Sequence, residues 1–226
     1  MPAALTAILP QTFLGKLPID LVREVLDTGR RSDVAAGTLL KQSKAKPGLS
    51  IVVEGLVRAF LRSPEGREVT VRYARPGETL GLVQLLGARL DVHAQAVTPT
   101  VLWMVSPRRL RELALESAPL AMALAEDCAE RVADSAEELA QVTFGSVRQR
   151  VARHLLDLAA AEEGALVARV NARTLADATG SVREVVARVL KDLEAAGVTG
   201  RSPVGVTILD AARLDAEGRG EQRARQ

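Results

Sequence analysis

The sequence has few residues that could carry catalysis or bind a metal. It contains one cysteine, Cys128, and two histidines, His93 and His154. A single cysteine excludes an intrachain disulfide and a cysteine-rich zinc or iron–sulfur site. An enzyme would need a nucleophile beside a base, or a set of metal ligands, and neither occurs at a plausible spacing. We therefore expect no catalytic residue, no metal and no cofactor.

Long hydrophobic runs and a strong net charge are also lacking. No run approaches the roughly 18 apolar residues that suggest a membrane span. The N-terminal MPAALTAIL is too short for a signal-peptide core and has no basic residue before it. We expect a cytoplasmic protein without a membrane partner. The formal net charge is only +2, so any contact with nucleic acid must come from a local cluster of basic residues.

What is present is an ordinary globular composition that changes character along the chain. The 226 residues are 47% hydrophobic and 26% charged, which suits one large domain or two modest ones. A helical pattern in IDLVREVLDTG is followed, from about Arg31 to Ser106, by short β-branched or alternating runs. These predicted strands are Thr38–Leu40, Leu49–Glu54, Leu56–Arg62, Glu68–Tyr73, Gln95–Val97 and Val101–Val105. Glycine and proline turn signals separate them, which favours an antiparallel sandwich or barrel.

A long helix is predicted after the strands, from Pro119 to Phe144, because this stretch contains no glycine or further proline. Its apolar face of about 25 residues is longer than is required to cover a small barrel. A second copy of the chain could pack against the remainder. We expect a homodimer; the alternative is a long helix that lies on the β domain. The predicted dimer seam consists of Leu120, Leu124, Cys128, Val132, Leu139 and Val142.

The stretch Asn171–Leu193 contains two short helical patterns separated by Thr179-Gly180-Ser181. Glycine permits the sharp turn, and we expect Ser181 to cap the second helix. Two helices joined by a short turn that contains glycine form a helix-turn-helix, which binds DNA. A capping box at Ser146 and Gln149 opens the helix before this motif, and a hairpin wing (Val198–Arg201 and Gly205–Leu209) follows it. The pattern predicts a winged helix.

Three charged residues at the start of the second helix are the candidates for contacting bases. Arg183 and Arg188 could each donate two hydrogen bonds to guanine, and Glu184 could accept one from cytosine. The alternative is a solvated face on which Glu184 and Arg188 pair one helical turn apart. Candidates for contacting the DNA backbone are Asn171, Arg173, Ser181, Arg201 and Ser202.

Three stretches resemble the Crp/Fnr superfamily of bacterial transcription regulators. They are VVEGLVRAFLRSPEGREVTVRYARPGETLG, FGSVRQRVARHLLDLA and LADATGSVREVVARVLKDLEAAGV. The resemblance spans Phe13 to Leu209 and implies an α+β fold with an N-terminal antiparallel β-roll, a long dimerisation helix and a C-terminal winged helix-turn-helix. The expected domains are 1–106 (β-roll with its N-terminal helix), 107–143 (linker and dimerisation helix) and 144–214 (winged helix), followed by a disordered tail at 215–226.

The family implies a homodimer that binds double-stranded DNA and contacts RNA polymerase. Arg183, Glu184 and Arg188 match the Arg-Glu pair and following Arg with which the cyclic-AMP-responsive branch recognises TGTGA half-sites. The resemblance therefore implies a TGTGA-like palindrome as the target.

The sequence departs from the family at the nucleotide site. Where cyclic-AMP receptors carry Gly-Glu and Arg-Ser, this chain has Gly81-Leu82 and Val92-His93, and Ser135-Ala136 stands at the adenine position. The arginine that neutralises the phosphate is missing, although the nearby Arg89 is an alternative donor. We expect DNA binding without cyclic AMP. The alternative is a regulator whose β-roll binds a non-standard small ligand or that senses oxidation through Cys128.

Overall fold

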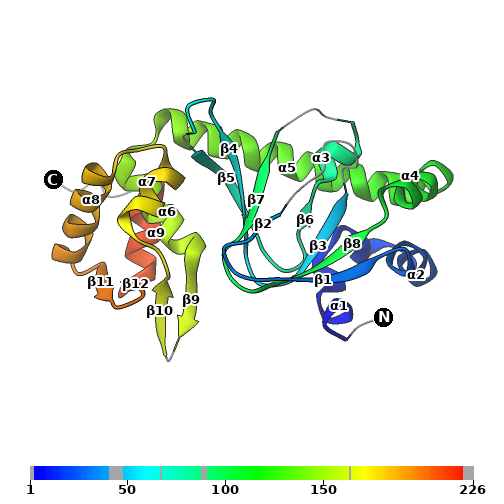
Figure 1. Cartoon of the computed structure of the whole chain (residues 1–226), viewed down its shortest axis with the longest axis horizontal. Helices are drawn as coiled ribbons and strands as arrows, with labels where there is room; N and C mark the ends of the chain where they lie inside the picture. Colours follow the sequence, from blue (N-terminus) through cyan, green and yellow to red (C-terminus); the bar gives the residue numbers. More distant parts are fainter. Residues whose placement is uncertain (1–2, 41–47, 67, 88–90, 163, 221–226) are drawn as a thin grey trace. The chain divides into compact units, whose positions relative to one another are not determined.

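The computed structural model describes residues 3–40, 48–66, 68–87, 91–162 and 164–220, and the alternative phosphate donor Arg89 lies outside them. The chain divides into two compact units (Figure 1). The first contains residues 1–61 and 71–135, and the second contains 62–70 and 136–226. Among the described residues, no helix combines the length and apolar character needed to cross a bilayer.

Two antiparallel four-stranded sheets form the β-roll. One has the order β1-β8-β3-β6 and the other β2-β7-β4-β5. The predicted strands are present as β2 (Leu39–Leu40), β3 (Leu49–Glu54), β4 (Val57–Arg62), β5 (Glu68–Ala74), β7 (His93–Ala96) and β8 (Thr100–Val105). Two strands were not predicted: β1 (Arg30–Val34), which has little hydrophobic content, and β6 (Thr79–Leu80), which is very short.

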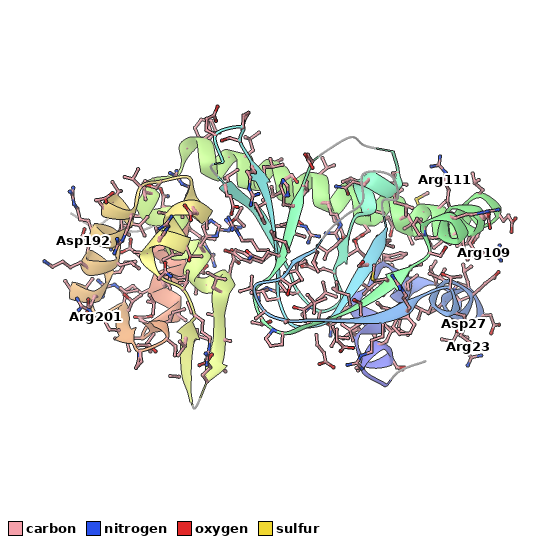
Figure 2. All side chains as sticks on the ribbon, viewed as in Figure 1. Arg23, Asp27, Arg109, Arg111, Asp192 and Arg201 are labelled. Atoms are coloured by element: carbon pink, nitrogen blue, oxygen red, sulfur yellow. The ribbon has the colours of Figure 1, made fainter. Side chains whose placement is uncertain are left out.

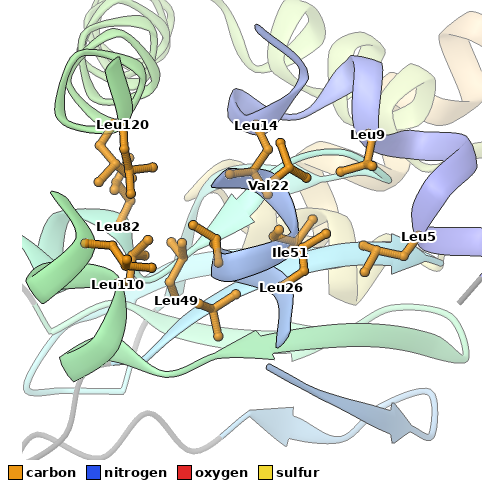
Figure 3. Packing of buried hydrophobic residues seen from close by; sticks show 14 of the residues in the cluster. Leu5, Leu9, Leu14, Val22, Leu26, Leu49, Ile51, Leu82, Leu110 and Leu120 are labelled. Carbon is orange, nitrogen blue, oxygen red and sulfur yellow. The ribbon is translucent and has the colours of Figure 1, made fainter. Parts of the chain in front are cut away.

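Helices cover the roll and complete its core. The N-terminal segment forms α1 (Ala3–Ile8) and two 3₁₀ turns, η1 (Leu9–Gln11) and η2 (Phe13–Lys16), and it is followed by α2 (Ile19–Asp27). Short helix α3 (Leu82–Leu85) and helix α4 (Pro107–Glu116) lie later in the chain. Figure 3 shows that leucines from these helices, from β3 and from the start of the following long helix share one core, with Leu5, Leu14, Leu49, Leu110 and Leu120 all fully buried.

Helix α5 (Ala118–Phe144) uses one face to pack on the roll of its own chain. Leu120 and Leu124 are 0% and 3% exposed in the roll core, and Cys128 packs against the same core. The assignment of Leu120 and Leu124 to a dimer seam was therefore wrong, because both leucines are buried inside the unit. The side chain of Val142 lies outside those that the structure describes.

A different face of α5 is apolar and exposed. Met122, Val132 and Leu139 are 61%, 64% and 66% exposed, and alanines fill the positions between them. The members recur at alternating steps of four and three, which is the spacing of a coiled-coil seam. We name this surface the exposed α5 face; it consists of Ala118, Met122, Ala125, Ala129, Val132, Ala136 and Leu139.

The second unit is a winged helix. Helix α6 (Val147–Leu158) begins with the predicted capping box, in which Ser146 and Gln149 bond each other's backbone. Its sheet has the order β11-β12-β10-β9, with β9 (Ala159–Glu162), β10 (Ala165–Ala168), β11 (Thr199–Ser202) and β12 (Gly205–Ile208). Together with the roll and the long helix, this unit confirms the α+β fold class.

The C-terminal segment corrects the expectation of a disordered tail from residue 215. Helix α9 (Ala211–Arg219) is capped by Asp210 and packs against α6. Leu214 is fully buried, and only 6% of Glu217 is exposed. Leu214 and Glu217 are the two buried residues of a helix whose other residues are small or polar. Residues 221–226 lie outside the described part of the chain.

Candidate nucleic-acid interface

The helix-turn-helix consists of α7 (Ala172–Thr179) and α8 (Arg183–Ala195). Gly180 ends α7 with φ of 62°, a left-handed conformation that glycine adopts without strain. Leu175, Val186 and Leu193 are fully buried and face the core of the unit. This packing turns the opposite side of α8 towards solvent.

The start of α8 differs from the expectation. The N-cap residue is Val182, which has an extended backbone and no side-chain cap, rather than Ser181. Ser181 is half-buried, and its backbone N–H donates to the carbonyl oxygen of Ala176. The turn between the helices is therefore one residue longer than the sequence suggested. It leaves Val182 59% exposed beside Arg183.

Arg183, Glu184 and Arg188 all lie on the exposed side of α8. In the part of the chain that the structure describes, these side chains form no ion pair with one another or with a neighbour. The Glu184–Arg188 pair that a purely solvated face would use is therefore absent there. Their charged groups are directed to solvent, where a ligand can reach them.

The two backbone candidates on α7 lie at its first turn. Asn171 is the N-cap residue, and its Oδ1 accepts hydrogen bonds from the backbone N–H groups of Arg173 and Thr174 at 3.0 and 2.9 Å. The cap uses the oxygen of the side chain, so a phosphate would be met by its Nδ2 donor. The Arg173 side chain is exposed.

A cleft of about 700 Å³ separates the wing from α8 and the start of α7. Its lining includes Arg201 and Ser202 of β11 and two residues that the sequence did not single out, Thr174 and Lys191. Figure 2 shows Arg201 extending from the wing. Its Nε lies 3.1 Å from the carboxylate of Glu194, and the Ser202 hydroxyl accepts from the backbone N–H of Val204. Both candidates thus line a cleft with basic and hydroxyl donors.

Arg150 was not singled out from the sequence, although it holds the motif to α6. Its guanidinium donates to the carbonyl oxygens of Thr179 at 3.0 Å and Gly145 at 2.6 Å. These bonds link the end of α7 to the residue that precedes the Ser146 cap. No local sequence signal marks such a contact, because its acceptors are backbone carbonyls.

A partly buried ion pair fixes α9 on α6. The Arg148 guanidinium donates to both carboxylate oxygens of Glu217 at 2.6 and 2.7 Å. The hydrogen bond from Arg148 holds the pKa of Glu217 below its ordinary value, and the same bond raises the pKa of Arg148. The pair thereby joins α9 to α6, the helix whose N-cap residue is Ser146.

Several residues that the family resemblance aligns with a nucleotide site pack or form hydrogen bonds within the chain. Leu82, which the family resemblance aligns with a ribose contact, is 2% exposed in the roll core. His93 stacks on Phe60 with a ring separation of 5.4 Å. The Ser135 hydroxyl donates to the carbonyl oxygen of Arg131 on its own helix. Among the described residues, no group of histidine, cysteine and acidic side chains is placed to hold a metal ion.

Comparison with known proteins agrees with this architecture. Residues 32–117 match the family model of the cyclic nucleotide-binding domain, and residues 149–217 match that of the Crp-like helix-turn-helix domain. The chain is 33% identical to Transcriptional regulator LdrP of Thermus thermophilus over 169 residues, which cover 73% of this chain and 84% of that protein.

Two further relatives are similar to the chain. The cAMP-activated global transcriptional regulator CRP of Salmonella typhimurium is 27% identical over 124 residues, which cover 54% of this chain and 59% of that protein. A solved transcriptional regulator of the CRP/FNR family from Thermus thermophilus aligns with a TM-score of 0.71 and 26% identity, over 84% of this chain and 98% of that one.

Proposed function

The chain belongs to the Crp/Fnr family of transcription regulators, and from that premise we propose that it is a homodimer that recognises a TGTGA-like palindrome through α8 without cyclic AMP. The observation that carries the proposal is the exposed set Arg183, Glu184 and Arg188 at the start of α8, which forms no ion pair within the described residues. These residue types match guanine and cytosine edges in the major groove. Arg173, Asn171, Ser181, Arg201 and Ser202 complete the proposal as DNA-backbone contacts.

The dimer forms through the exposed α5 face. Its 4-3 spacing places the side chains along one line of a left-handed coiled coil. The central alanines let two helices approach closely, while Met122, Val132 and Leu139 supply the apolar area. Dimeric helix-turn-helix proteins bind two half-sites one helical turn apart, about 34–36 Å, which fits a palindromic target.

Independence from cyclic AMP is supported by the residues at the nucleotide positions. Leu82 is buried in the core and offers no acceptor to a ribose hydroxyl. Val92 offers no charge to a phosphate, and a phosphate without a cation or several N–H donors is bound weakly. A second candidate, activation by an unidentified ligand or by oxidation of Cys128, is tested by the same experiment. Because Cys128 packs on the roll of its own chain, a disulfide across the twofold axis is disfavoured.

We further propose that the protein binds chromosomal DNA in the cytoplasm and contacts RNA polymerase, as the family resemblance implies.

The test is to select binding sites from a random double-stranded pool and then to titrate the selected site. We expect a palindrome with TGTGA-like halves, bound with equal affinity with and without cyclic AMP. Binding should weaken as salt rises, because phosphate contacts release counterions. A scrambled palindrome of equal composition is the control. An unrelated half-site would refute the base contacts, and a large gain with cyclic AMP or with an oxidant would refute the effector-free mechanism.

A further inference from the structure

A network of three polar side chains joins α5 to the roll. Nη2 of Arg131 donates to Oδ1 of Asp127 at 2.9 Å and to the hydroxyl of Thr79 at 2.8 Å. The Thr79 hydroxyl in turn donates to Oδ2 of Asp127 at 2.9 Å. Only 13% of each charged side chain is exposed, and Thr79 is 1% exposed. Each member is thus bonded to both others inside the first unit.

A second ion pair lies against this network. Nη1 of Arg72 on β5 is 2.7 Å from the carboxylate of Glu78, and its Nη2 donates to the carbonyl oxygen of Thr79. Burial lowers the pKa of Arg72, and the nearby charge of Arg131 lowers it further. The cluster therefore contains two guanidinium groups and two carboxylates, so it is neutral without any bound ion.

Such a network constrains α5 more strictly than its leucines do. Apolar contacts at Leu120 and Leu124 are non-directional and tolerate a small rotation of the helix. Buried ion pairs oppose such a rotation, because separating the partners leaves an uncompensated charge in a poorly solvated environment. Rotation about the helix axis decides which face points outward. Val132, a central member of the exposed α5 face, directly follows Arg131.

We propose that Thr79, Asp127 and Arg131 are positioning residues for DNA binding, which fix the rotation of α5 on the roll so that the exposed α5 face can pair without a ligand. This inference rests on the proposed function. The protein supplies these bridging contacts between α5 and the roll from its own side chains.

The experiment compares Asp127→Asn and Thr79→Val with Glu126→Gln in the full-length protein. Asp127→Asn removes the charge that compensates Arg131, and Thr79→Val removes the bridging hydroxyl while keeping the shape. Glu126 is the matched control, since it precedes Asp127 on α5 and pairs with Lys16 in solvent, where the two side chains are 49% and 76% exposed. Affinity for the selected palindrome and the dimer dissociation constant are both measured where circular dichroism shows each variant fully folded.

We expect Asp127→Asn to weaken both DNA binding and dimerisation about ten-fold, the factor given by about 1.4 kcal/mol. Thr79→Val should change both in the same direction by less, and Glu126→Gln should leave both unchanged. Two folded network variants that dimerise as tightly as the wild type would overturn the proposal. If the wild type binds no palindrome, the proposed DNA target is wrong. The dimer dissociation constants alone then test whether the Thr79, Asp127 and Arg131 network positions α5.

Discussion

The two units leave opposite kinds of surface without a partner among the described residues. In the first unit, Arg72 and Arg131 are paired internally with Glu78 and Asp127, while the outer face of this unit's part of α5 is apolar. In the second unit, apolar side chains such as Leu175 and Val186 are buried, while Arg183 and Arg188 lie in solvent. An apolar stripe is suited to another protein surface, and exposed guanidinium groups are suited to nucleic acid. Arginine is thus paired inside the first unit at Arg72 and Arg131, whereas Arg183 and Arg188 of the second unit remain available for the DNA contacts that we propose.

The largest effect should come from placing a charge on the exposed α5 face. Val132→Glu would set two like charges opposite each other in a dimer, which costs several kcal/mol. We expect a folded monomer that has lost palindrome binding, as measured by analytical ultracentrifugation and fluorescence anisotropy. Leu115→Glu is the control, because Leu115 is 82% exposed on α4 rather than on α5. A Val132→Glu protein that remains dimeric would show that another surface forms the interface.

Removing a guanidinium that we propose contacts a base should weaken binding less than loss of the dimer does. Arg183→Ala should cost about 1–3 kcal/mol and relax the preference for one guanine in the half-site. Titrations of the palindrome and its single-base variants give both quantities. Arg219→Ala, which removes an exposed arginine of α9 paired with Asp215, should change neither. Equal losses on all sequences would identify Arg183 as a backbone contact.

The ion pair between Arg148 and Glu217 should make the stability of the second unit depend on pH. Because Arg148 lowers the pKa of Glu217 in the folded state, the pair stabilises the unit above the ordinary carboxyl pKa. That stability is lost as pH falls from the ordinary value through the lower folded value. Glu217→Gln should reduce the free energy of unfolding by about 1–2 kcal/mol at neutral pH. The loss of stability in this variant should be smaller at a pH below the folded-state pKa of Glu217. Denaturant unfolding of both proteins at neutral pH and at that acidic pH is the measurement. A loss that does not depend on pH would contradict this account.

The smallest effect is a gain in stability. Val182→Ser should give α8 the side-chain cap that it lacks and raise the free energy of unfolding of the second unit by about 1 kcal/mol. Val182→Ala, which adds no cap, is the comparison. Thermal denaturation of both variants is the measurement. Equal melting temperatures would mean that the introduced serine hydroxyl does not accept a hydrogen bond from the helix N–H groups.

Most of the fold could be predicted from the sequence because its signals are local. The capping box at Ser146, the glycine turn at Gly180 and the β-branched strands are each encoded within a few residues, and each is present. Strands β1 and β6 escaped prediction because tertiary pairing alone makes them strands: β1 pairs with β8 along its whole length. Helix α9 was not predicted because its sequence has a single leucine, while tertiary contacts such as the buried Leu214 and the Arg148–Glu217 pair hold it in place.

The two faces of α5 illustrate the remaining limit. The sequence alone determined that a long helix runs from about Pro119 to Phe144 and that a helix-turn-helix with two arginines and a glutamate follows. The sequence places apolar residues on more than one side of the long helix. Their spacing does not reveal which side packs on the roll. Tertiary structure decided the matter, because Leu120 and Leu124 fill the roll core, while Asp127 and Arg131 bond to Thr79. Once that side is buried, the face with Met122, Val132 and Leu139 is the one that remains in solvent.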